Sequence, residues 1–118
     1  MAAPRVLVSD PLSDDGIQKL KSAGFQVDVE TGLSEEALSK KIRGYDALII
    51  RSQTKVTSKV IAGANGLKII ARAGVGVDNV DLEAATKKGI IVVNSPEGNT
   101  IAAAEHTVAM MLSLARHI

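Results

Sequence analysis

Residues 67–81 read LKIIARAGVGVDNVD, and the interpretation of the whole chain starts from this stretch. Its first five residues form a short, largely apolar run, which is typical of a buried strand. Glycines follow at positions 74 and 76, and Asp81 is placed to cap a helix that begins after it. The stretch therefore predicts a strand, a glycine-containing loop and a helix, with Arg72 at the entrance to the loop.

A loop of this kind suits a small anion. Glycine lets the backbone approach a ligand and turn its N–H groups toward negative charge. The guanidinium of Arg72 is planar and permanently charged, which fits a carboxylate or a phosphate. Ligands of open α/β sheets bind outside the carboxyl ends of the strands, where this loop would lie. A plain strand-to-helix turn with a surface arginine fits the same spacing, because glycine is a common turn residue.

The rest of the chain repeats the alternation of strand and helix. We expect strands at residues 5–9, 25–29, 46–50, 67–71 and 90–93, and helices at residues 14–23, 34–44, 58–62 and 82–88. Short connections between alternating elements favour a parallel sheet with helices on both faces. Five strands in about a hundred residues favour the flavodoxin-like strand order. The predicted fold class is α/β, a flavodoxin-like three-layer sandwich with a five-stranded parallel sheet.

A long helix is expected to close the chain, over residues 100–118, with Asn99 or Thr100 as its cap. Its apolar residues cover nearly the whole circumference, a pattern typical of a buried helix. The sheet can cover one face of that helix only. We therefore divide the chain into a domain at residues 1–99 and a linker helix at residues 100–118, and we expect either a fragment of a longer protein or self-association through the helix.

Composition excludes several classes of protein. The net charge of the 118-residue chain is +1, so no basic surface for nucleic acid or an anionic membrane is expected. The chain has no cysteine, which excludes disulfides and thiolate zinc sites. No apolar run is long enough to cross a bilayer, and the first residues do not resemble a signal peptide. A cytoplasmic protein is the expectation that fits these features.

Three blocks of the sequence carry a family resemblance. They are IRSQTKVT at residues 50–57, RAGVGVDNVD at residues 72–81, and VVNSPEGNT at residues 92–100 with AAEHT following at residues 103–107. In this order and spacing they resemble the D-2-hydroxyacid dehydrogenase family, and the similarity runs from about Val6 to the end of the chain. The blocks are more specific together than any one of them alone.

The resemblance implies an enzyme that transfers hydride from C2 of a 2-hydroxy acid to NAD. Such enzymes have a substrate-binding domain of flavodoxin-like fold, and the long helix leads from it to a nucleotide-binding domain that carries the catalytic residues. This chain matches only the first part. Its Gly74 and Gly76 continue to Asn79 where a dinucleotide fingerprint needs glycine. We therefore expect no catalytic residue here and an inactive fragment of a homo-oligomeric parent enzyme.

The resemblance also assigns a substrate site for 3-phosphoglycerate or a similar small anion. Its loop amides would hold the substrate carboxylate and its arginines the anionic end. The predicted substrate-binding residues are Arg51, Ser52, Arg72, Ala73, Gly74, Val75 and Gly76. Val75 is also predicted to touch the NAD cofactor. No metal site is predicted. His106 and His117 match no catalytic spacing, and we interpret His106 as a packing or interface residue and His117 as a surface residue.

Other functions fit the sequence less well. A phospho-receiver domain needs an aspartate at the end of the third strand, where this chain has Arg51, although Asp10 follows the first strand. A flavodoxin needs a hydroxyl-rich phosphate loop and aromatic residues, and the chain has one Phe, one Tyr and no Trp. A substrate domain for another 2-hydroxy acid, and a non-catalytic module that dimerises or binds anions, remain open alternatives.

Overall fold

A computed structural model describes residues 3–74, 76–95 and 100–116, with the side chains of the last range described from residue 104 onward. The strands are β1 (Arg5–Val8), β2 (Gln26–Val29), β3 (Ala47–Ile50), β4 (Ile69–Ala73) and β5 (Ile91–Ser95), and the helices are α1 (Asp14–Ser22), α2 (Glu35–Lys41), α3 (Ser58–Gly63), α4 (Leu82–Lys87) and α5 (Thr100–Arg116). Each strand and helix predicted from the sequence is present.

The five strands form one parallel sheet in the order β2-β1-β3-β4-β5. Strand order reverses between β1 and β3, because β2 lies on one side of β1 and the later strands lie on the other. This is the flavodoxin-like order, and the prediction of fold class is confirmed. Parallel strands place all their carboxyl ends at one edge of the sheet, hereafter the carboxyl edge, where ligands bind in such folds.

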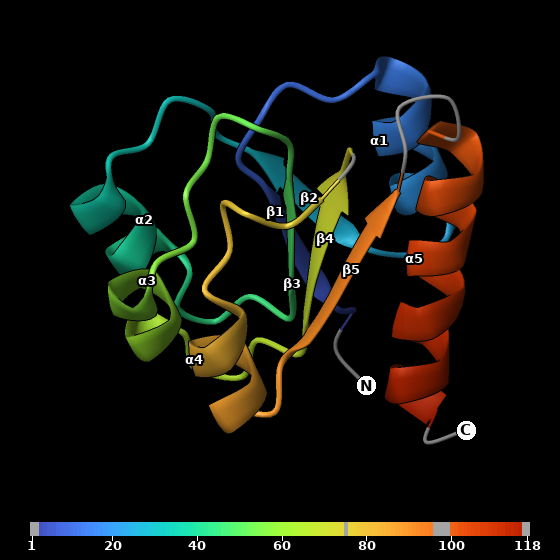
Figure 1. Cartoon of the computed structure of the whole chain (residues 1–118). Coiled ribbons are helices and arrows are strands. Elements are labelled where there is room, and N and C mark those ends of the chain that lie inside the picture. The colour runs from blue at the N-terminus through green and yellow to red at the C-terminus, as the bar shows by residue number, and fades with distance from the viewer. Residues whose placement is uncertain (1–2, 75, 96–99, 117–118) are drawn as a thin grey trace.

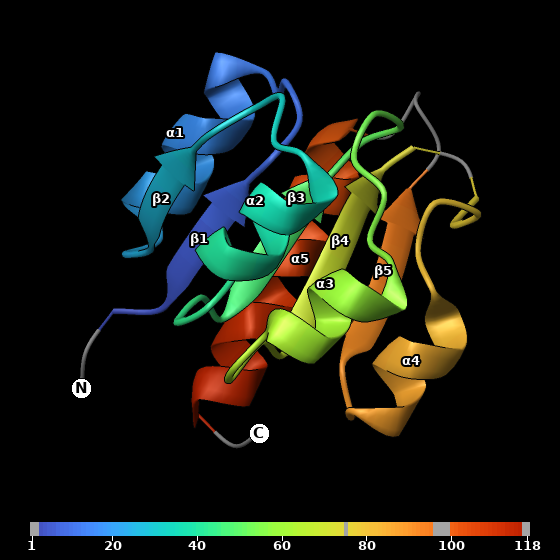
Figure 2. The same cartoon turned by 90° about the vertical axis from the view of Figure 1, so that its left-hand side faces the viewer.

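Helices cover both faces of the sheet (Figures 1 and 2). Helices α2, α3 and α4 cover one face, and α1 and α5 cover the other. The strands supply alternate side chains to each side, since successive residues of a strand point to opposite faces. In β3, Leu48 and Ile50 join the core under α2, α3 and α4, whereas Ala47 and Ile49 join the core under α1 and α5.

Local sequence fixes where the helices begin. Ser13, Ser34, Thr57 and Asp81 each accept a hydrogen bond from a backbone N–H in the first turn of the helix that follows. Capping of this kind satisfies N–H groups that have no partner within the helix. The predicted cap at Asp81 is confirmed.

Two strands are longer than predicted at the carboxyl edge. Strand β4 continues through Arg72 and Ala73, and β5 continues through Asn94 and Ser95. The two extensions pair with each other, Arg72 with Asn94 and Ala73 with Ser95. Polar residues end the apolar run in the sequence, but the ladder continues because each extension supplies the other's partner. As a result Arg72 lies within a strand and not in the loop.

Helix α5 lies along the sheet (Figure 1), with Thr107 and Met111 buried and Leu112 44% exposed. The sheet therefore covers one side of this apolar helix, as expected. Among the described residues, no helix has the length and apolarity needed to cross a membrane. The division into a domain and a linker helix stays a prediction, and within this chain the helix forms part of the outer layer of the sandwich.

Candidate functional site

Two loops meet at the carboxyl edge, one after β3 and one after β4. Residues 51–56 follow β3 and residues 74–81 follow β4, and β3 and β4 are neighbours in the sheet. The loops are also paired directly: the N–H of Val56 donates to the carbonyl of Asn79 at 2.8 Å, and the N–H of Asp81 donates to the carbonyl of Val56 at 2.9 Å. The predicted site residues on these loops are therefore brought to one edge.

Arg51 and Ser52 open the first loop and both are exposed. The guanidinium of Arg51 approaches the carbonyl of Pro11 at 3.5 Å, a distance at the outer limit for a hydrogen bond. Its charge is therefore available to solvent and to a ligand. Lys55, on the same loop, is exposed as well.

Arg72 is placed differently from Arg51, because its side chain is only 11% exposed. One nitrogen of the guanidinium donates to the carbonyl of Gly76 at 3.0 Å and to Asp78 Oδ1 at 2.9 Å. These bonds hold the pKa of the Asp78 carboxyl below its usual range, and the main cause is the hydrogen bond from Arg72. The Arg72 Nε is buried and has no hydrogen-bond partner in the described part of the chain. Arg72 thus braces the loop through one guanidinium nitrogen, and its Nε is a buried donor without a partner among the described residues.

The glycines of the second loop have distinct roles. The carbonyl of Gly74 accepts a hydrogen bond from the N–H of Ser95 at 3.1 Å, and its own N–H donates to the carbonyl of Arg72 at 3.1 Å. Gly76 has a φ of 82°, a left-handed conformation that strongly favours glycine. The predicted contact residue Val75 lies outside the described residues, as does His117.

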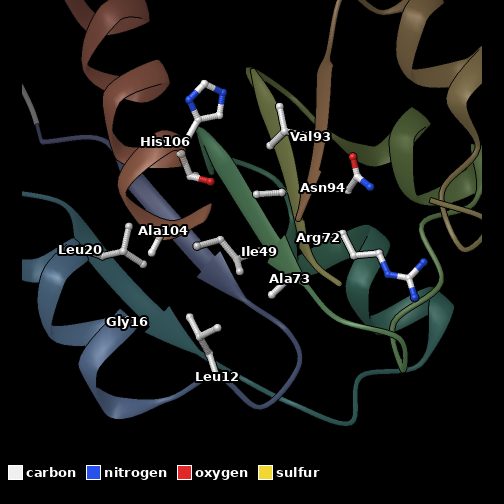
Figure 3. Close-up of a pocket in the computed structure, with 12 residues that line it drawn as sticks. Leu12, Gly16, Leu20, Ile49, Arg72, Ala73, Val93, Asn94, Ala104 and His106 are labelled. Atoms are coloured by element: carbon white, nitrogen blue, oxygen red, sulfur yellow. The ribbon is translucent and has the colours of Figure 1, made fainter. Parts of the chain in front are cut away.

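An apolar hollow of about 50 Å³, open to solvent, lies on the face of the sheet that α1 and α5 cover, between these helices and the ends of β3, β4 and β5 (Figure 3). Its lining includes Leu12, Leu20, Ile49, Ala73, Val93 and Ala104. The Arg72 side chain extends away from it, because Arg72 and Ala73 alternate across the sheet. Ala73 therefore faces the hollow, and His106 is an exposed residue at its rim.

Sequence reasoning missed two residues that hold the first loop in place. Asp10 is 2% exposed and accepts hydrogen bonds from the N–H of Arg51 at 2.7 Å and of Thr54 at 3.0 Å. Asn79 donates from Nδ2 to the carbonyls of Arg51 at 2.8 Å and of Thr54 at 2.7 Å. The available sign in the sequence is that Asp10 directly follows a buried strand, a position that we considered only for a phospho-receiver site. Among residues 3–74, 76–95 and 104–116, no cluster of side chains is arranged to hold a metal ion.

Known proteins resemble the chain over nearly its whole length. It is 61% identical over 114 residues to D-3-phosphoglycerate dehydrogenase of Synechocystis sp., covering 97% of this chain and 20% of that protein. It is 53% identical over 114 residues to D-3-phosphoglycerate dehydrogenase of Archaeoglobus fulgidus, covering 97% of this chain and 22% of that protein. The chain thus spans about a fifth of the length of these relatives.

Solved structures agree with the sequence relatives. The crystal structure of cofactor (NAD+) bound 3-phosphoglycerate dehydrogenase from Entamoeba histolytica matches with a TM-score of 0.74 at 30% identity, over 95% of this chain and 39% of that one. The family model for D-isomer specific 2-hydroxyacid dehydrogenase, catalytic domain, matches residues 6–116. The chain therefore belongs to the D-isomer specific 2-hydroxyacid dehydrogenase family.

Proposed function

We propose that this chain is the substrate-binding domain of an NAD-dependent D-3-phosphoglycerate dehydrogenase. The parent enzyme would transfer hydride from C2 of 3-phosphoglycerate to NAD, giving the 2-keto acid 3-phosphohydroxypyruvate for serine biosynthesis in the cytoplasm. Identity of 61% and 53% to D-3-phosphoglycerate dehydrogenases supports this substrate over other 2-hydroxy acids. A sister enzyme acting on another 2-hydroxy acid is the nearest alternative.

One observation carries the proposal: the loop after β3, which begins at Arg51, and the loop after β4, the strand of Arg72, are joined at the carboxyl edge. The side chain of Asn79, in the loop after β4, donates to the backbone carbonyl of Arg51 at 2.8 Å. Two arginines are thereby held at the carboxyl edge, Arg51 after β3 with its charge exposed and Arg72 in β4 with its charge paired to Asp78. A positively charged edge of this kind suits a small anionic substrate. Arg51 would bind one anionic group directly, and Ser52, Ala73, Gly74, Val75 and Gly76 would complete the site.

NAD itself does not fit a site made by this chain alone. The turn after β1 reads SDPL at residues 9–12, without the glycines that let a backbone approach a pyrophosphate. We therefore assign to this chain only the binding and orientation of the substrate, with Val75 as the one proposed contact to the cofactor. We further propose that the chain alone is inactive and that α5 leads to the nucleotide-binding domain.

An NMR titration of the 118-residue chain tests the substrate site. 3-Phosphoglycerate should shift the amides of Arg51, Ser52, Gly74 and Gly76 more strongly than inorganic phosphate or D-lactate does. Arg51→Ala should weaken binding about tenfold, since one charge-assisted contact contributes about 1.5–3 kcal/mol and water competes at an exposed site. Arg43→Ala removes an exposed arginine at the opposite edge of the sheet and serves as the control. Equal shifts with D-lactate, or equal losses in both variants, would contradict the proposal.

A second proposed property is self-association through α5. Leu112 is 44% exposed, and Val108, Ala109 and Leu112 line a shallow hollow of α5 that Lys19 of α1 borders. Leu112→Glu should shift the chain toward the monomer in sedimentation equilibrium, because a charge cannot be buried in an apolar contact without a partner. Val29→Glu, at a residue 50% exposed on the edge strand β2, is the matched control. A wild-type chain that is monomeric at high concentration would contradict this property.

A further inference from the structure

The loop after β3 is held by two side chains of opposite hydrogen-bonding character. Asp10 follows β1 and contributes only acceptors, and Asn79 follows β4 and contributes an N–H2 donor. Both reach the same two residues of the loop, Arg51 and Thr54. β1, β3 and β4 are neighbours in the sheet, so the loop is gripped from both sides.

Asp10 and Asn79 together bind the backbone N–H and the backbone carbonyl of both Arg51 and Thr54. The N–H groups of both residues donate to Asp10 Oδ2, at 2.7 and 3.0 Å. The carbonyls of both residues accept from Asn79 Nδ2, at 2.8 and 2.7 Å. Ser52 and Gln53, the two residues between them, lie outside this clamp and are exposed.

The second oxygen of Asp10 is used as well. The hydroxyl of Thr54 donates to Asp10 Oδ1 at 2.7 Å, and its oxygen lies 3.0 Å from the hydroxyl oxygen of Ser9. Ser9 is 1% exposed and Asp10 is 2% exposed, so both of these partners of Thr54 are buried. A buried carboxylate is costly unless donors surround it, and Asp10 has three. Its contacts all serve the loop.

The orientation of Asn79 is also determined by its partners. If its amide were turned by half a rotation, its oxygen would face two carbonyl oxygens and lose both hydrogen bonds. With Nδ2 directed at the loop, Oδ1 is buried and without a hydrogen-bond partner in the described part of the chain. An unpaired buried acceptor carries a cost, which the two bonds to the loop offset.

We propose that Asp10 and Asn79 are positioning residues for the anion site: together they clamp residues 51 and 54 so that Arg51 and Ser52 are presented at the carboxyl edge. This inference rests on the proposed function, because it assigns the clamp to the loop that would bind the substrate. Neither residue needs to touch the anion. Each acts through the loop, since a displaced charge binds a ligand of fixed shape less well.

The two isosteric exchanges give the sharpest test, because their outcomes should differ. Asp10→Asn keeps one oxygen for the two N–H groups, and its new N–H2 can donate to the Thr54 hydroxyl, which then donates to the Ser9 carbonyl 3.3 Å away. Asn79→Asp places oxygen against two carbonyls and cannot be rescued in this way. Affinity for 3-phosphoglycerate should stay within about threefold for Asp10→Asn and fall about tenfold or more for Asn79→Asp, a difference of about 1.4 kcal/mol per factor of ten.

Hydrogen exchange separates positioning from general stability. In Asp10→Ala, exchange of the Arg51 and Thr54 amides should accelerate more than that of amides in β1 or β4. Thr54→Val removes one contact of the clamp and supplies a milder variant if Asp10→Ala does not fold. Asp46→Ala is the matched control, because Asp46 accepts a backbone N–H from Arg5 at 2.8 Å at the opposite edge. It should leave loop exchange and anion affinity unchanged.

Three results would overturn the inference. The first is unchanged loop exchange and unchanged affinity in Asp10→Ala and Asn79→Ala. The second is acceleration of all amides equally, which would make the two residues ordinary contributors to stability. The third is a wild-type chain whose Arg51 and Thr54 amides are protected but which binds neither 3-phosphoglycerate nor inorganic phosphate. That result would refute the proposed function and reduce the clamp to a brace of the loop.

Discussion

The two faces of the sheet are packed in different ways. Helices α2, α3 and α4 have seven, six and six residues, yet they cover most of the largest fully buried side chains, including Tyr45 and Leu48. Helices α1 and α5 are longer, with nine and 17 residues, but leave the open hollow between them and the sheet. Helix length therefore does not determine how tightly a face is closed.

The tightly packed face also supports the site. Val56 is 1% exposed and Val80 is 6% exposed, and both belong to the core under α2, α3 and α4. They pair with each other as an isolated bridge, one from each of the two loops at the carboxyl edge. The loops are thus anchored in the better-packed core, and the hollow lies on the face that does not carry them.

The largest effect is expected from a methyl group added between two helices of the tight face. A Cβ at Gly63 would lie 2.4 Å from the backbone carbonyl oxygen of Ser39, so α2 and α3 would have to separate. Gly63→Ala should lower the free energy of unfolding by about 3 kcal/mol, the upper range for overpacking. Urea denaturation measures it.

The same substitution on the other face is the matched control. A Cβ at Gly16, in α1, would meet Leu12 at 3.4 Å, which is ordinary contact. Gly16→Ala should therefore be neutral or raise the free energy of unfolding by up to about 1 kcal/mol, because alanine favours the helix. If both alanines destabilise equally, the contrast between the two faces is wrong.

The second largest effect is expected from Lys88, which binds the end of α3 on the tightly packed face. The Nζ of Lys88 donates to the carbonyls of Ile61, Ala62 and Ala64 at 2.9, 3.3 and 2.7 Å, which satisfies the end of α3. Lys88→Met keeps the apolar part of the side chain but removes the ammonium group. The free energy of unfolding should fall by about 1.5 kcal/mol, because the three carbonyls lose their donor.

Thermal unfolding of Lys87→Met provides the comparison for that lysine. Lys87 is 76% exposed and pairs with Glu83 on the same helix, four residues away. Such surface pairs contribute about 0.3–0.5 kcal/mol. If Lys87→Met lowers thermal stability as much as Lys88→Met does, the bonds from the Lys88 ammonium to the three carbonyls contribute little to stability.

A third, smaller effect should come from filling the hollow. Ala104 lines it from α5, and a larger apolar side chain there would be partly buried against Leu20 and Ile49. Ala104→Leu should raise the free energy of unfolding by about 1 kcal/mol, the range typical of cavity filling. Ala62→Leu, at an exposed position of α3, should change it little. Destabilisation by Ala104→Leu would mean that the hollow has no room for the side chain.

The sequence was sufficient to predict the sheet because its information is local. Apolar runs, capping residues and glycines lie within a few positions of the elements they define, and the alternation of strands and helices restricts the topology. The ends of β4 and β5 were missed because Arg72 and Asn94 are polar, and only their pairing across the sheet makes them strand residues.

The site was predictable only in outline. Topology places Arg51 and Arg72 at one edge, but no periodic pattern shows that Arg72 turns toward the carbonyl of Gly76. The clamp joins residues 41 and 28 positions apart, Asp10 to Arg51 and Asn79 to Arg51, and side-chain partners so distant leave no trace in spacing. What the sequence lacks is the direction of polar side chains, which the packed fold determines.

The smallest effect should appear as a dependence on pH at the outer edge of the sheet. The hydroxyl of Tyr45 donates to Asp28 Oδ2 at 2.6 Å, and this bond, helped by the charge of Arg5, lowers the pKa of Asp28. A carboxyl with a lowered pKa stabilises the fold above its unfolded pKa, and the contribution is lost as pH falls through the folded value. Asp28→Asn should therefore lower Tm slightly at neutral pH, and the difference should vanish in acid.

In the Tyr45→Phe background, which keeps the ring 4.4 Å from Arg5, the pH-dependent difference should shrink, because the main cause of the pKa shift is gone. A difference of the same size in both backgrounds would assign the shift to Arg5 instead.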